Sequence, residues 1–380
     1  MISRRMFLGG AAAVAAAVPV GIAVTSWTGD AKAAAPTGLA LSAVNRTGVH
    51  ADSDLTMYIV GTDPAGSQAF VRADGSLQAV TAALNGPNGF ADLSIPFGTR
   101  ITLPKMSGRI YFAAGAKLPF RVVNGSALQF PAGWVAGDPS FGVLHDWIEF
   151  TFNDAGMFCN TTMVDMFSMP MAIQLTGKAG QTTGTLGPGG RAAIFKALSA
   201  DPVFGKLVVD NGQRVMAPGH GLEAGVFPAD FFDAFVDQVW TKYASTDLVV
   251  KTDTNTFTGR VSGDVLRFDN GVAPIKRPST RDVLFCDGAL AAPNDGVTGP
   301  VAAIVAAGLN RGTLLADANQ PATDPKSFYA NAKPHLYAKV MHDNSVDGHA
   351  YGFAFDDVAN FAAFIQDPAP TAMTVTLTPF

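Results

Sequence analysis

The sequence predicts a mainly β protein of sandwich or barrel type with a mixed α/β segment inserted into it. Short apolar runs bounded by Gly, Pro, Asn and Asp recur from residue 37 to about residue 176, which is the rhythm of antiparallel sheets. The composition agrees, because 40 Gly, 24 Pro and only 15% charged residues favour strands and turns over long helices. We therefore expect a β domain over residues 36–176, an inserted lobe over 177–320, and a return to the β domain over 321–380.

Residues 1–35 have the features of an export signal. Arg4-Arg5 precedes Phe7-Leu8, and an Ala/Val/Gly run leads to the small-residue cleavage pattern Ala31-Lys32-Ala33. A membrane anchor is the alternative, but Pro19 interrupts the run, which falls short of the ~20 apolar residues of a spanning helix. The sequence therefore predicts secretion by the twin-arginine route and no membrane association after cleavage.

The β domain should contain a hairpin with acidic side chains. From Trp147 to Asn153 the residues alternate, so that Ile148, Phe150 and Phe152 share one face and Trp147, Glu149, Thr151 and Asn153 share the other. Residues 153–156 (Asn-Asp-Ala-Gly) supply a turn, and residues 157–159 are apolar enough to return as a strand. The strands expected before this hairpin are residues 55–60, 68–71, 100–103, 109–112 and 120–123.

Two carboxylates accompany this hairpin. Glu149 lies on its first strand and Asp165 lies just beyond its return. Paired carboxyl groups are what cleavage of a glycosidic bond requires, although two acids sixteen residues apart are more often solvated surface groups.

The inserted lobe should combine helices and strands. Apolar residues recur at helical spacing in residues 228–243, behind Asp230 as a candidate N-cap. Trp240 and Tyr243 lie on this apolar stripe, which favours a place in the core over a role as sugar platforms. Two further helices are expected at residues 191–198 and 300–315. Residues 248–285 should form strands, among them a hairpin of 256–261 with 265–268. Later strands are expected at 350–355 and 372–377. Two lobes of this kind would leave a wide groove between them.

Several other kinds of site find little support. The net charge of −5 with no cluster of Lys and Arg argues against nucleic acid as a partner. Neither a metal-binding motif nor a cofactor motif is present, and His342 and His349 read as surface residues. Asp282 beside Arg281 reads as an ion-paired structural residue.

The two cysteines leave a choice open. Cys159 follows the hairpin and Cys286 would end a strand of the inserted lobe, so a disulfide could join the lobes. The alternative is two buried thiols that pack as small hydrophobic groups.

The hairpin resembles the signature of a known enzyme family. The strings Asp146-Trp147-Ile148-Glu149-Phe150-Thr151-Phe152-Asn153 and Phe158-Cys159-Asn160-Thr161-Thr162-Met163-Val164-Asp165 are similar to glycoside hydrolase family 64. Further blocks agree in order at residues 257–261, 277–283, 308–311 and 351–358. The resemblance implies an endo-β-1,3-glucanase of the laminaripentaose-producing type, with a thaumatin-like barrel. Cys159 and Phe355 depart from the pattern, since a small non-thiol residue and a tyrosine are expected there.

The resemblance also assigns roles. It implies that Glu149 is the general acid and Asp165 the general base of an inverting hydrolysis, with no cofactor. The expected glucan-binding residues are Trp147, Thr151, Asn153, Asn160, Thr161, Asp356 and Asp357. Asp356 and Asp357 could equally cap a helix over residues 358–365. The alternative function is a non-catalytic β-glucan-binding protein of thaumatin-like type. In either case we expect a monomer whose partner is a neutral β-1,3-glucan.

Geometry adds a requirement to this pairing. In a hairpin turning at Asp154-Ala155, Glu149 faces Asn160 or Thr161, and a straight strand would place Asp165 ~13 Å further along. Carboxyl groups that cooperate in inversion lie ~6.5–9.5 Å apart, so residues 162–164 must bend back toward Glu149.

The export signal can be tested directly. Replacing both Arg4 and Arg5 with lysine should leave precursor in the cytoplasm, because the twin-arginine route reads the arginine pair. Fractionation and immunoblotting would measure this. Normal secretion of the double variant would contradict the assignment.

Overall fold

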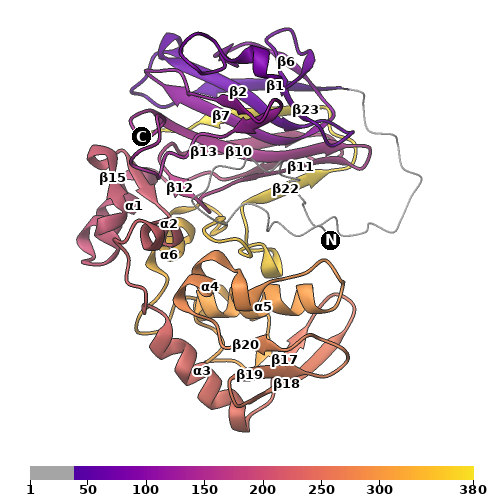
Figure 1. The fold of residues 1–380 in the computed structure, drawn as a ribbon, viewed down its shortest axis with the longest axis vertical. Coiled ribbons are helices and arrows are strands. Elements are labelled where there is room, and N and C mark those ends of the chain that lie inside the picture. The colour runs from indigo at the N-terminus through magenta and orange to yellow at the C-terminus, as the bar shows by residue number, and fades with distance from the viewer. Residues whose placement is uncertain (1–37) are drawn as a thin grey trace.

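The computed structural model describes residues 38–380, so the predicted export signal lies outside the described residues. Two sheets pack face to face in the upper part of the molecule (Figure 1). The five-stranded sheet has the order β14 (Gln181–Thr183), β13 (Met171–Thr176), β23 (Ala372–Leu377), β1 (Gly38–Asn45) and β6 (Ile101–Pro104). The eight-stranded sheet has the order β22 (Phe364–Asp367), β11 (Gly156–Thr161), β10 (Leu144–Asn153), β7 (Met106–Ala114), β2 (Leu55–Thr62), β3 (Gln68–Val71) and β4 (Leu77–Ala79), and β5 (Ile95–Pro96) pairs with β2.

The predicted β-rich class is confirmed, as a sandwich and not as a closed barrel within the described residues. Alternate residues of each strand fill the space between the sheets, where Ile148, Phe150 and Phe152 of β10 are buried against β1, β13 and β23. The opposite face of the eight-stranded sheet has its own core, which includes Tyr111 and Trp147. Both faces of β10 are therefore packed, as the alternation of the sequence requires.

The chain between β14 and β22 forms a second lobe. Its helices are α1 (Gly190–Ala200), α2 (Pro218–Glu223), α3 (Asp233–Ser245), α4 (Thr280–Phe285), α5 (Thr298–Arg311) and α6 (Leu336–Asn344). A five-stranded sheet, β20 (Ile275–Lys276), β19 (Val265–Phe268), β18 (Thr256–Ser262), β17 (Leu248–Lys251) and β21 (Asn319–Gln320), lies below α5 in Figure 1. A small three-stranded sheet has the order β12 (Met166–Phe167), β16 (Arg214–Met216) and β15 (Val208–Val209). Strands β8 (Arg121–Val123) and β9 (Ala127–Gln129) form a separate two-stranded sheet. Of the described strands, those of the sandwich lie before residue 184 or after residue 363.

Most of the expected helices and hairpins are confirmed. Trp240 and Tyr243 are buried on α3, in the core of the second lobe, although α3 begins after Phe232 and not behind Asp230. No helix within residues 38–380 combines the length and apolar character needed to cross a bilayer.

Three local predictions are wrong. Residues 350–355 are not a strand: they turn so that Phe353 enters the core of the second lobe. A helix over 358–365 is absent, because this stretch holds only a short 3₁₀ turn (Val358–Asn360) and the start of β22. Residues 280–285 form α4 and not a strand, and the carboxylate of Asp282 accepts from the backbone N–H of Ser279 in a capping box, in place of the expected ion pair.

The choice that the sequence left open for the two cysteines is decided against a disulfide. Cys159 packs between the sandwich sheets, whereas Cys286 follows α4 and packs in the core of the second lobe. No bridge joins them, and burial raises the pKa of the Cys159 thiol. The alternative of two buried thiols is confirmed.

A buried ion pair connects the second lobe to the segment that returns to the sandwich. The Arg311 guanidinium at the end of α5 donates to the Asp356 carboxylate at 3.1 Å and to the backbone oxygens of Asp356 and Val358. The second Asp356 oxygen lies 2.8 Å from Nε2 of His342. His342 is thus 5% exposed and not on the surface, which corrects the prediction for it; His349 is half exposed beside Asp347.

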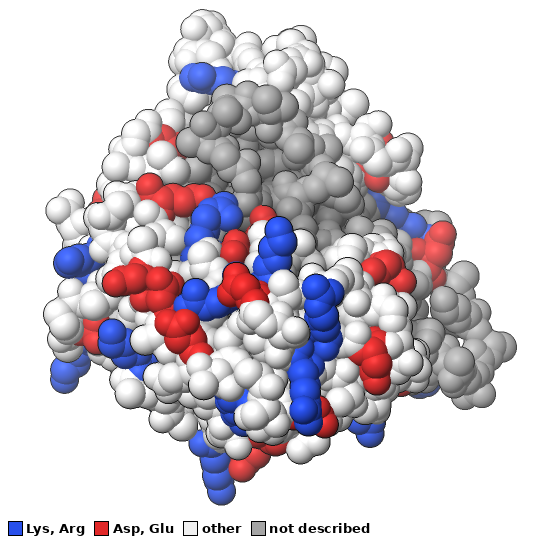
Figure 2. Space-filling view, turned by 60° about the horizontal axis from the view of Figure 1, so that its bottom comes forward, with Lys and Arg blue, Asp and Glu red and all other residues white. Residues whose placement is uncertain are grey.

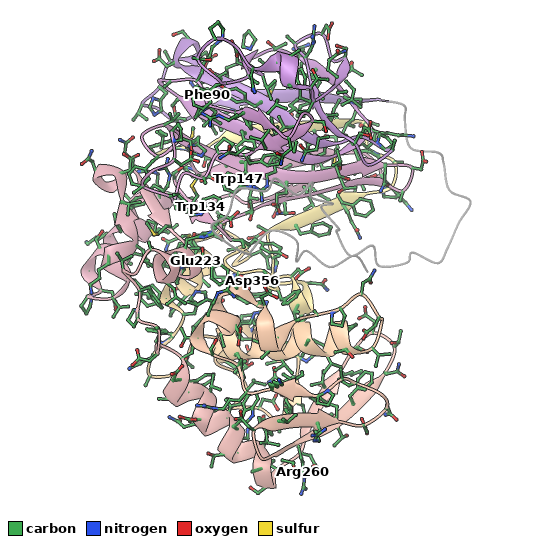
Figure 3. The ribbon with its side chains drawn as sticks, viewed as in Figure 1. Phe90, Trp134, Trp147, Glu223, Arg260 and Asp356 are labelled. Atoms are coloured by element: carbon green, nitrogen blue, oxygen red, sulfur yellow. The ribbon has the colours of Figure 1, made fainter. Side chains whose placement is uncertain are left out.

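We predict that Arg311→Met destabilises the protein by about 3–5 kcal/mol, because the buried Asp356 carboxylate loses its guanidinium partner. Urea denaturation followed by circular dichroism would measure the change. Arg260→Met is the matched control, since Arg260 pairs with Asp247 at the exposed far end of the second lobe (Figure 3) and should cost less than about 1 kcal/mol. Equal urea concentrations at the midpoint of unfolding for the two variants would contradict the prediction.

Candidate active site

The first part of the site is a row of three side chains across neighbouring strands. In the sheet register, Glu149 of β10 lies opposite Arg109 of β7 on one side and opposite Asn160 of β11 on the other. Directly paired side chains on one face of a sheet contact each other. The Arg109 Nη2 atom is 3.3 Å from Oε1 of Glu149, and Asn160 donates from Nδ2 to Oε2 at 3.2 Å. Both oxygens of Glu149 therefore have donors, and the hairpin register predicted for Asn160 is confirmed.

Two aromatic side chains hold Arg109 in place. Its guanidinium carbon lies 4.7 Å from the centre of the Trp147 ring, and Nη1 donates to the Tyr111 hydroxyl at 3.2 Å. The Trp147 and Tyr111 rings, paired across β10 and β7, contact each other with centroids 5.2 Å apart. A guanidinium stacked on an aromatic face is favoured electrostatically.

Asp165 reaches the same arginine. After β11 the chain turns, fixed by the Met163 amide donating to the Tyr351 carbonyl at 2.8 Å and the Tyr337 hydroxyl donating to the Met163 carbonyl at 2.6 Å. Oδ2 of Asp165 then lies 3.6 Å from Nη2 of Arg109, the atom that contacts Glu149 at 3.3 Å, so these two carboxylate oxygens are at most about 7 Å apart. The bend required by the sequence is present.

Asp146 anchors the segment after Asp165 to the strand that carries Glu149. Its carboxylate accepts from the backbone N–H groups of Trp147, Ser168 and Met169 at 3.0, 2.8 and 3.2 Å. A buried carboxylate that accepts three backbone hydrogen bonds joins two segments firmly. The separation of Glu149 and Asp165 is therefore set at both ends of the connecting chain.

A histidine and a third carboxylate complete the site. His220 of α2 places Nε2 3.0 Å from Oδ1 of Asp165 and Nδ1 3.4 Å from Oε2 of Glu223. The amide of Ala217, just before α2, donates to the Asp165 carbonyl at 2.9 Å. The His220 ring stacks on Trp134 with centroids 4.4 Å apart, and Figure 3 shows Trp134 between Trp147 and Glu223.

The charges in this group compensate one another. Burial favours the neutral form of Asp165, but the hydrogen bond and charge of His220 and the charge of Arg109 together lower the pKa of Asp165. Burial likewise opposes the charge on His220, yet its bonds to Asp165 and Glu223 raise the pKa of this histidine. The hydrogen bond from His220 lowers the pKa of Glu223. Asp165 is thus an ionised carboxylate, as a general base must be.

Of the other predicted site residues, Asn160 and Trp147 contact Glu149 and Arg109, and the rest are dispersed. Trp147 is 1% exposed and supports Arg109 from below. Thr151, Asn160 and Thr161 are buried on the hairpin. Asn153 is exposed and accepts from the Ala155 amide in the turn. Asp356 is fully buried against Arg311, and Asp357 precedes the short 3₁₀ turn without a side-chain cap.

Comparison with known proteins places the chain in a family. A model of the β-1,3-glucanase family, glycoside hydrolase family 64, matches residues 37–377. The chain belongs to glycoside hydrolase family 64. Two relatives, the glucan endo-1,3-beta-glucosidases of Arthrobacter sp. (strain YCWD3) and Cellulosimicrobium cellulans, are each 38% identical over 294 residues, covering 74% of this chain and 54% of theirs. The chain thus spans about half the length of these relatives.

Solved structures agree with this membership. A laminaripentaose-producing β-1,3-glucanase in complex with laminaritetraose is 36% identical, with a TM-score of 0.83 over 90% of this family 64 chain and 99% of the other. A β-1,3-glucanase domain from Clostridium beijerinckii is 27% identical, with a TM-score of 0.79 over 90% and 98%. The sandwich with its second lobe is therefore the fold of the family.

Arg109, His220 and Glu223 were not found from the sequence. Arg109 reads as one polar residue in a strand, and its contact with Glu149 depends on the pairing of β7 with β10. His220 and Glu223 do show a signal, because residues three apart on a helix share a face. Within residues 38–380, no three His, Cys, Asp or Glu side chains come together as a metal-binding group.

Proposed function

We propose that this chain is an endo-β-1,3-glucanase that hydrolyses internal bonds of β-1,3-glucan with inversion at the anomeric carbon. Family membership supports the reaction class and the substrate class. The observation that carries the mechanism is the contact of both Glu149 and Asp165 with one nitrogen atom of Arg109.

Glu149 would act as the general acid and protonate the leaving glycosidic oxygen. This role requires Glu149 to hold a proton when the glucan is bound, and a bound glucan would favour that by excluding water from the carboxyl group. Asp165 would take a proton from water as that water attacks the anomeric carbon from the opposite face. The ionised state of Asp165 suits this task.

The contacts of Asp165 support single displacement over a covalent intermediate. A nucleophilic carboxylate lies ~5 Å from the acid, whereas inversion uses ~6.5–9.5 Å to admit water. The upper bound of about 7 Å set by Arg109 admits both separations. Both oxygens of Asp165 are also engaged by cationic side chains, which restrains the carboxylate from moving onto the sugar.

The charge distribution fits a neutral polymer. Figure 2 shows acidic and basic side chains interspersed on the face that it displays, without a patch of one sign. A non-catalytic glucan-binding protein is the second candidate, but a binding groove has no need of an acid and a base around one arginine. A reducing-end assay on laminarin separates the two functions.

We also propose that the protein is secreted by the twin-arginine route, on the evidence of Arg4-Arg5.

We predict that Glu149→Gln and Asp165→Asn each lower laminarin turnover roughly 100- to 10,000-fold, because each removes an ionisable group without changing its shape. Reducing-end release would measure turnover, and circular dichroism would confirm folding. Asp154→Asn is the matched control: Asp154 lies at the exposed turn of the same hairpin and its variant should keep full activity. Retained turnover in either site variant would remove that residue from the mechanism.

We predict that the first products are α-anomers, because a single displacement inverts the β-configuration. Proton NMR of the products before mutarotation would record the anomeric signals. An initial β-anomer would require a double displacement, and Asp165 could then no longer be the general base.

A further inference from the structure

His220 is the residue of the site whose role is still unassigned. Its ring is 7% exposed, with Trp134 stacked on one face and the Phe285 ring edge-on at 5.8 Å. The backbone before α2 is hydrogen-bonded to the Asp165 carbonyl, so the ring and Asp165 share one rigid framework. The imidazole therefore has little freedom to turn away from Asp165.

The two partners of His220 determine its protonation. Nε2 faces an Asp165 oxygen and Nδ1 faces a Glu223 oxygen. An ionised carboxylate only accepts hydrogen bonds, and a neutral imidazole has a single N–H to donate. Two such contacts are satisfied together only by the imidazolium, which donates from both nitrogens. The raised pKa of His220 agrees with this geometry.

We propose that protonated His220 is a positioning residue for Asp165, which it holds in the orientation of the general base, and that Glu223 maintains the charge of His220. This inference rests on the proposed function, since it gives Asp165 a task to be positioned for. Arg109 fixes Oδ2 of Asp165 and His220 fixes Oδ1, so the carboxylate is held at both oxygens. Loss of the charge on His220 would leave one N–H for two carboxylates and would remove the ionic part of its hold on Oδ1.

The surrounding charges define the pH dependence. His220 contacts the carboxylates of Asp165, after β11, and of Glu223, on its own helix. Arg281 of α4 lies 3.8 Å from Glu223. Arg109 of β7 contacts the other oxygen of Asp165. His335, before α6, lines a small pocket with His220 and Phe285, and burial lowers the pKa of His335 to about 4, so it is neutral there. His220 is thus the group of this set whose titration near neutral pH would alter Asp165.

Three variants separate the effects of the His220 hydrogen bonds, of its charge and of Glu223. His220→Phe keeps a ring against Trp134 but loses both hydrogen bonds, and kcat should fall on the order of 100-fold with a smaller change in KM. His220→Gln keeps a donor for Asp165 without the charge, so the acid limb of the pH profile, which Asp165 sets, should move to higher pH. Glu223→Gln keeps an acceptor for Nδ1 but removes the negative charge beside it, so the His220 titration followed by NMR should move to lower pH.

The experiment is a pH profile of kcat and of kcat/KM on laminarin for these variants, the wild type and Asp165→Asn. His349→Gln is the matched control, because His349 pairs with Asp347 at the surface and its loss should move neither limb. Nitrogen NMR of the histidine rings, assigned with His220→Gln, reads the charge without activity: His220 should carry two N–H protons at pH 7.

The outcomes are distinct. If Asp165→Asn is inactive while His220→Gln keeps the acid limb of the wild type and Glu223→Gln leaves the His220 titration unchanged, the positioning role is overturned and the proposed function stands. A His220 signal with one protonated nitrogen at pH 7 overturns the role as well. If Asp165→Asn remains active, the base assignment fails, and the inference fails with it.

Discussion

Arg109 is a buried cation shared by two carboxylates, and the site depends on keeping it in place. Its charge is opposed by burial, but Tyr111, Glu149 and Asp165 raise its pKa, so it remains a guanidinium. The Trp147 ring supports it from below and the pairing of β7 with β10 places it opposite Glu149. Without the arginine, two acids less than about 7 Å apart would repel each other in a poorly hydrated position.

Side chains from the sheet, from the turn after β11 and from α2 come together in the group around this cation. The sheet supplies Arg109 and Glu149, the turn after β11 supplies Asp165, and α2 supplies His220. Each junction is made by backbone hydrogen bonds: those to the Asp146 carboxylate, and that of Ala217 to Asp165. Positions fixed in this way have little thermal freedom, which is what precise placement of an acid and a base requires.

The parts of this arrangement that are local in sequence could be predicted. The alternation of residues 147–153 and the Asn-Asp-Ala-Gly turn gave the hairpin and the register of Glu149 with Asn160, because strand period and turn chemistry act over a few residues. Arg109 could not be found in this way, since it lies forty residues before Glu149 and only the strand order brings them together. Residues 350–355 alternate as a strand would, but Phe353 serves the core of the second lobe, and tertiary packing decides their conformation. Asp356, expected at the groove or as a helix cap, and His342, expected at the surface, could not be placed from the sequence for the same reason: Asp356 pairs with Arg311 of α5 and with His342 of α6.

The order of strands in the sandwich has a consequence for how the chain acquires its structure. β22 covers the outer edge of β11, and β23 lies between β1 and β13, yet both strands follow the whole second lobe. The hairpin that carries Glu149 therefore has an unpaired edge until more than two hundred residues beyond Thr161 have been made or ordered. Contacts so far apart in sequence form slowly, and an exposed edge invites pairing with other chains. Protection of the nascent sandwich from aggregation is thus a demand that this topology places on the cell that synthesises it.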